Sequence, residues 1–174
     1  EIKHCGKTYY VNREIIKLHS ELLSSQEDLN PVILPSIEGP IESLLKFFNG
    51  EHVEITKENA LFYYIMSTYL NLQDDSIQKA AQKFLPNVPT VDIVSRFFKS
   101  LKGVNISVNY EKYSNYFHLI REYLINDSNP YISNSAVDYI IEKNVQISDE
   151  TSKIIMGILL DDLKEYEDEI SYQS

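Results

Sequence analysis

Residues 40–56 read PIESLLKFFNGEHVEIT and carry the clearest folding signals in the sequence. Four apolar residues recur at the spacing i, i+3, i+4 and i+7, which places them on one face of a helix: Ile41, Leu44, Leu45 and Phe48. Pro40 suits the first position of that helix, and Gly50 can adopt the left-handed conformation that ends it. The pattern therefore predicts a helix that begins at Pro40 and stops at Gly50.

The residues before this helix predict a small amount of β structure. Residues 1–12 contain a Gly6-Lys7 turn between two short stretches, the second rich in aromatic and β-branched residues, and this indicates a hairpin. Residues 14–24 have apolar side chains at helical spacing and predict one helix, and the polar residues 25–30 predict a loop after it. Residues 31–37, PVILPSI, are short, branched and bracketed by prolines, so they suit an edge strand.

Two helices are expected after residue 56. The first has an apolar face and begins near Thr56 as a plausible cap; its face consists of Leu61, Tyr64, Ile65, Thr68 and Tyr69. The second has Asp75 and Gln78 at capping-box spacing and Pro86 just past its end; its apolar stripe consists of Ile77, Ala80, Ala81, Phe84 and Leu85. A boundary is predicted near residues 86–89.

Beyond that boundary the pattern is almost wholly helical. The predicted helices cover residues 91–101, which stop at Gly103, and residues 113–124, 136–143 and 151–163. Residues 104–108 alternate with period 2 and form either a strand or an extended link. The fold class expected is α+β and mostly helical, with one domain over residues 1–86 and an all-α extension over residues 87–174.

The composition argues against several kinds of partner. The 174 residues carry a formal charge of −10, and no cluster of lysine and arginine opposes it. A phosphate backbone or an anionic membrane surface would repel such a chain, so neither nucleic acid nor a membrane is expected as a partner. Cys5, the single cysteine, excludes an internal disulfide framework and indicates a reducing compartment, the cytoplasm or nucleus.

Motifs for catalysis or cofactor binding are not found in the sequence. The five glycines lie too far apart to form a phosphate-binding loop. Potential metal ligands are scattered without the usual short spacings; they are His4, Cys5, His19, His52 and His118. We therefore expect no metal site, no cofactor and no enzymatic activity, and we interpret Cys5 as a small apolar residue near a strand.

The order of predicted elements over residues 2–85 resembles the BTB/POZ domain. This family shows a glycine hairpin, a helix that ends in a conspicuous serine and hydrophobic residues, a strand, and a helix that closes on an aromatic-x-Gly turn. The corresponding residues here are Gly6, residues 18–23 (LHSELL), residues 32–34 (VIL) and residues 47–50 (FFNG). The resemblance implies a BTB/POZ-like fold with a small sheet and helical hairpins. Residues 131–150 are similar to the helical extension, called BACK, that often follows such domains.

The resemblance also implies binding rather than catalysis. It predicts a protein-protein interaction module that acts as a scaffold or adaptor in an assembly. The alternatives are a substrate adaptor of a cullin-type ubiquitin ligase and a structural subunit of a large complex such as the cytoskeleton. Many dimerising members carry an additional N-terminal strand and helix that this sequence lacks, so a homodimer and a hetero-oligomer both stay open. The candidate partner-binding residues are Phe47, Phe48, His52, Tyr63, Tyr64 and Tyr69.

Overall fold

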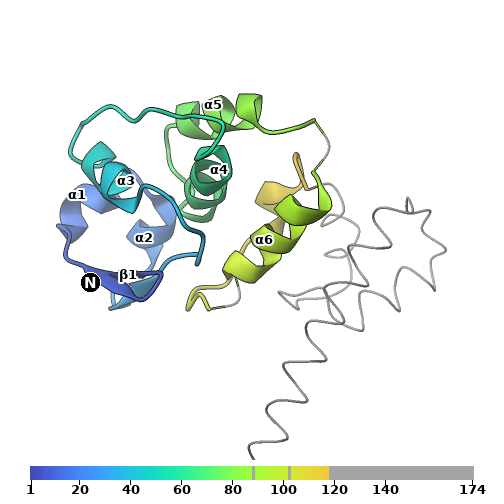
Figure 1. The fold of residues 1–174 in the computed structure, drawn as a ribbon. Coiled ribbons are helices and arrows are strands. Elements are labelled where there is room, and N and C mark those ends of the chain that lie inside the picture. Colours follow the sequence, from blue (N-terminus) through green and yellow to red (C-terminus); the bar gives the residue numbers. More distant parts are fainter. Residues whose placement is uncertain (88, 102, 118–174) are drawn as a thin grey trace, which may run out of the picture.

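The computed structural model describes residues 1–87, 89–101 and 103–117 (Figure 1). These residues form a small α+β fold with six α-helices and one three-stranded sheet. In the view of Figure 1, α4 (Ala60–Tyr69) lies in the middle, with α3 (Ile41–Phe47) and α6 (Val91–Leu101) on opposite sides of it. The predicted helices at residues 136–143 and 151–163 and the BACK-like resemblance lie outside the described residues.

The predicted hairpin is confirmed, with its turn one residue earlier than expected. Strands β1 (Ile2–His4) and β2 (Lys7–Tyr9) pair antiparallel, and the two turn residues are Cys5 and Gly6, with φ angles of 47° and 78°. Positive φ at both turn residues gives the twist that a two-residue hairpin requires. Strand β3 (Val32–Ile33) pairs parallel to β1, and the strand order β2-β1-β3 places β3 at an edge, as predicted.

The single helix predicted over residues 14–24 is wrong, because the chain breaks there into α1 (Arg13–Lys17) and α2 (Glu21–Ser25). Ser20 causes the break. Its backbone is extended, and its hydroxyl accepts a hydrogen bond from the Leu23 amide at 3.2 Å, which caps α2. The same hydroxyl donates to the Leu70 carbonyl at 2.6 Å, which ties the break to the end of α4.

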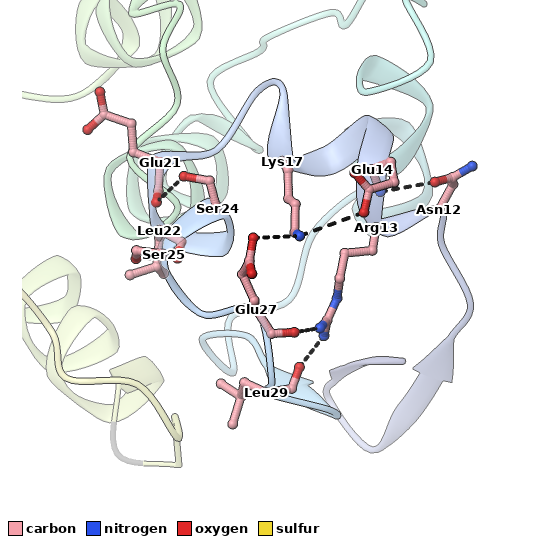
Figure 2. A network of polar contacts seen from close by, with 10 residues as sticks. All are labelled: Asn12, Arg13, Glu14, Lys17, Glu21, Leu22, Ser24, Ser25, Glu27 and Leu29. Atoms are coloured by element: carbon pink, nitrogen blue, oxygen red, sulfur yellow. Dashed lines mark hydrogen bonds and ion pairs between the residues drawn. The ribbon is translucent and has the colours of Figure 1, made fainter.

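Ser20→Ala is expected to lower the free energy of unfolding by about 2 kcal/mol, because it removes a helix cap and leaves the buried Leu70 carbonyl with only the longer, 3.4 Å hydrogen bond from the Leu22 amide. Urea unfolding followed by circular dichroism measures the change. Ser24→Ala is the matched control, since the exposed Ser24 hydroxyl only donates to the Glu21 carbonyl of its own helix (Figure 2). Equal effects of the two substitutions would contradict the role of Ser20.

The helix predicted from residues 40–56 is confirmed as α3. Pro40 is its N-cap, and Ile41 and Leu44 are buried, as is Phe48 just after its last turn. Gly50 follows with a φ of 90°, in the left-handed region expected for a helix stop. Residues 52–56 then lead to α4 without forming a strand.

Helix α4 differs from its prediction in burial and in its cap. All ten of its residues are buried, whereas the pattern predicted a single buried face. Thr56 is not the cap; its amide donates to the Asn59 side-chain oxygen at 2.7 Å, and Asn59 precedes the helix. A helix that is buried all round has neighbours on every side, which sequence periodicity alone does not reveal.

Helix α5 (Ser76–Phe84) is confirmed, but the predicted capping box is not formed. Asp75 makes no side-chain cap hydrogen bond, and the Asp74 carboxylate instead accepts from the Ser76 amide at 2.9 Å. Ile77 and Ala81 are buried on the predicted stripe, whereas Phe84 is 47% exposed. The stripe therefore covers the core only in the first two turns of the helix.

Packing continues beyond the boundary predicted near residue 86. Helix α6 (Val91–Leu101) has its predicted bounds, and residues 104–108 form no strand, since the chain bends at Asn105 and Ile106. A short 3-10 helix, η1 (Tyr110–Tyr113), precedes the start of the helix predicted over residues 113–124, most of which lies outside the described residues. The core cluster that includes α4 also includes six later residues: Phe97, Leu101, Ile106, Tyr113, Tyr116 and Phe117.

Hydrogen bonds also join this later segment to the first one, and two of them involve α4 and the residues after β3. The Tyr113 hydroxyl donates to the Ile65 carbonyl of α4 at 2.9 Å, and the Ser36 amide donates to the Ser100 carbonyl at 2.7 Å. Residues up to 117 thus pack against the same core as residues 1–87. The separate extension over residues 87–174 stays a prediction.

Candidate functional site

An exposed apolar patch lies at the break between α1 and α2. Leu18, the C-cap of α1, is 70% exposed. The next residue, His19, has its ring centroid 5.7 Å from that of Phe47 and 5.7 Å from that of Phe48. The two phenylalanine rings are 5.9 Å apart, so the three rings form one contact group. We refer to Leu18, His19 and Phe47 as the Leu18 patch.

The backbone beneath the Leu18 patch is held in place by the strand-like contact next to it. The Gln73 amide donates to the His19 carbonyl at 3.0 Å, and Ser20 forms an isolated antiparallel bridge with Leu72. Phe48 is buried beneath the patch, and Phe47 and His19 are half-buried. The exposed Leu18 side chain therefore stands on a fixed base rather than on a long loop.

The structure separates the six predicted partner-binding residues into two groups. Phe47 belongs to the Leu18 patch, and His52 is exposed in the link between α3 and α4. The other four are core residues and present no surface in the described chain: Phe48, Tyr63, Tyr64 and Tyr69 are at most 5% exposed. The prediction is corrected for these four. The three tyrosines belong to α4, which is buried on all sides, and Phe48 is buried at the C-terminal end of α3.

Burial also changes the acidity of these tyrosines. Desolvation raises the pKa of Tyr64 to about 12 and raises the pKa of Tyr69 further. Desolvation raises the pKa of Tyr63 as well, despite a hydrogen bond with Ser43 that lowers it. All three phenols are neutral at physiological pH and act in packing.

His4 and Cys5 lie close together without forming a catalytic pair. The His4 Nε2 atom is 2.7 Å from the Ile37 carbonyl oxygen, so this nitrogen must carry a proton to donate to it. The Cys5 Sγ atom is 3.4 Å from the same nitrogen, which therefore cannot take the thiol proton. Burial of the thiol raises the pKa of Cys5, and the nearby negative charge of Glu38 raises it further. The thiol is thus not activated, and His4 is a buried anchor of the hairpin.

A small hollow beside the sheet offers little room for a ligand. Its volume of about 30 Å³ accommodates water rather than a substrate. The lining residues are Glu1, Ile2, Val11, Arg13, Ile16, Leu23, Gln26 and Val32. Arg13 is engaged with the chain, since its guanidinium donates to the carbonyls of Glu27 and Leu29 (Figure 2).

Lys17 completes a structural network next to this hollow. Its ammonium group lies 3.1 Å from the Glu27 carboxylate and 3.7 Å from that of Glu14 (Figure 2). The network fastens the loop after α2 to α1. Among the residues that the structure describes, no three histidine, cysteine or acidic side chains gather as metal ligands. None of the described helices is long and apolar enough to cross a membrane.

Comparisons with protein-family models, with curated proteins and with solved structures found no match to this chain. The class that the fold defines is therefore a small, mostly helical α+β protein with a three-stranded sheet.

Proposed function

We propose that residues 2–85 form a BTB/POZ-like domain and that the chain is an intracellular, non-enzymatic interaction module. It acts as a scaffold or adaptor in a protein assembly. The order of a hairpin, a helical pair, a parallel edge strand and three further helices supports the proposed fold. Gly6, Ser20 and Gly50 occupy the turn, the helix break and the helix stop, which are the positions that carried the resemblance.

The exposure of Leu18 is the observation that carries the proposed function. Covering a leucine side chain that is 70% exposed stabilises a complex by roughly 1–2 kcal/mol. His19, the next residue in the chain, contacts the Phe47 ring. Aromatic and aliphatic side chains on a fixed backbone are typical anchors of protein interfaces. The Leu18 patch therefore suits an apolar side chain of a protein partner.

Site-specific photocrosslinking tests this function directly. A photoreactive phenylalanine analogue replaces Leu18 in the full-length protein in its native cells, and crosslinked proteins are identified by mass spectrometry. The same analogue at the exposed Lys57 is the control for crosslinking by mere exposure. We expect one protein to be enriched at position 18 over position 57.

A binding measurement with the purified partner then separates a specific contact from chance capture. Leu18→Ser is expected to weaken that binding about tenfold, because the apolar contact is lost, while the melting temperature of the chain stays unchanged. Equal crosslinking at both positions, or binding that Leu18→Ser leaves intact, would show that the Leu18 patch is not an interface.

A further inference from the structure

The two edge strands of the sheet differ in whether their outward-facing backbone groups have hydrogen-bond partners. The outer edge of β3 is occupied by the Asn105 side chain, whose Nδ2 donates to the Pro31 carbonyl at 2.8 Å. Its Oδ1 accepts from the Ile33 amide at 3.0 Å. One side-chain amide thus takes the place of a neighbouring strand and closes this edge.

The outer edge of β2 is open in the part of the chain that the structure describes. A two-residue turn makes His4 and Lys7 a hydrogen-bonded pair, and such pairs alternate along an antiparallel ladder. Thr8, opposite Lys3, therefore directs its amide and carbonyl away from β1. No described residue hydrogen-bonds to these groups, and Thr8 and the following Tyr10 are exposed, Tyr10 by 80%.

The charge at this edge is opposite to that of the whole chain. Residues 1–12 contain two lysines and one glutamate, a net charge of +1 in a chain of −10. Lys3 and Lys7 are exposed, and neither forms an ion pair with another described residue. Edge lysines discourage pairing with a second basic strand, and two lysines without partners favour an acidic one.

We propose that the open edge of β2 binds an extended acidic segment of a partner protein as a fourth strand of the sheet. The inference rests on the proposed function as an interaction module but uses a surface other than the Leu18 patch. Backbone groups of Thr8 supply the hydrogen bonds. Lys7, on the edge strand, faces the acidic side chains of the partner, and Lys3 on the neighbouring strand β1 adds to the positive charge of this edge. Tyr10, two residues after Thr8 and on the same side of the strand, offers its ring to a β-branched side chain of the partner.

A short peptide of alternating glutamate and valine is the probe, and a peptide of alternating lysine and valine is its control. Fluorescence anisotropy measures binding to the full chain, and amide hydrogen exchange reports whether the Thr8 amide becomes protected. We expect the acidic peptide to bind at least about tenfold more tightly than the basic one. Protection of the Thr8 amide is expected only with the acidic peptide.

Two substitutions at Thr8 separate backbone pairing from side-chain contact. Thr8→Pro removes the outward amide donor without removing a bond to β1 and is expected to weaken peptide binding about tenfold. Thr8→Val keeps the amide and is expected to leave binding within about twofold. Lys7→Glu, an exposed change that does not alter the backbone, is expected to weaken binding about threefold or more and to reduce its salt dependence.

Several results would overturn this inference. Equal affinity for the acidic and basic peptides, or binding insensitive to Thr8→Pro and Lys7→Glu, would rule out an acidic strand at this edge. A dimer in light scattering that Thr8→Pro abolishes would identify a second copy as the occupant instead. Because the peptide assay does not involve Leu18, its failure would leave the photocrosslinking test of the Leu18 patch unaffected.

Discussion

Phe97→Ala is expected to lower the free energy of unfolding by about 3–5 kcal/mol. The Phe97 side chain has no exposed surface. Its ring stacks on Phe117 at 4.1 Å between centroids and meets Tyr113 edge-on at 4.8 Å. Removal of the ring leaves a cavity between α6 and the segment that follows it, and the flanking aromatic rings lose their contacts.

The measurement is urea unfolding of the full chain, followed by circular dichroism. Phe84→Ala is the matched control, since Phe84 is 47% exposed near the end of α5 and is expected to change stability by less than about 1 kcal/mol. If Phe97→Ala had no larger effect than Phe84→Ala, the core would not extend beyond the boundary predicted at residue 86. A single transition shifted by Phe97→Ala would show that residues on both sides of that boundary unfold together.

The sequence predicted best those elements whose signals are local. Pro40, the apolar period after it and Gly50 describe α3 without reference to any other part of the chain. Prolines on both sides of β3 likewise indicated an edge strand, because proline lacks the amide that a central strand needs. The bounds of α6 followed from its period and the glycine after it.

Contacts between distant residues account for the errors. Ser20 ends α1 and begins α2 because its hydroxyl reaches Leu70, fifty positions away, and the apolar period runs through this break without a change. Ser20 followed by the acidic Glu21 was a local signal for a new helix start. The prediction of one helix from the apolar period did not take this signal into account.

The candidate site was only partly predictable for the same reason. Phe47 was among the predicted partner-binding residues and does lie on the Leu18 patch. The three tyrosines of α4 were selected because tyrosine occurs both at interfaces and at the edge of a core: Tyr63, Tyr64 and Tyr69. Their burial in the core becomes evident only from the central position of α4 in the fold. Leu18 and His19 were missed as site residues, since an apolar residue in a helical period is expected to be buried, and the break that exposes Leu18 is a tertiary effect.

Gly39→Ala is expected to lower the free energy of unfolding by about 3 kcal/mol, although Gly39 itself is exposed. A Cβ atom at position 39 would lie 2.3 Å from the Cδ2 and Cγ atoms of Phe62 and 2.7 Å from its Cβ atom. Phe62 is 1% exposed, and its ring packs edge-on against His4 and Tyr63. The ring has no space into which it can move, so the backbone before α3 must shift.

Gly103→Ala is the control for this last prediction, because a Cβ atom there meets no other atom within 4 Å. It is expected to change stability by less than about 0.5 kcal/mol or to stabilise the chain slightly, since alanine restricts the unfolded state. Thermal unfolding of both variants measures the difference. A Gly39→Ala variant as stable as Gly103→Ala would mean that the backbone before α3 can shift without lowering the free energy of unfolding. The close contact of Gly39 with Phe62 would then not be what holds the start of α3 against the central helix α4.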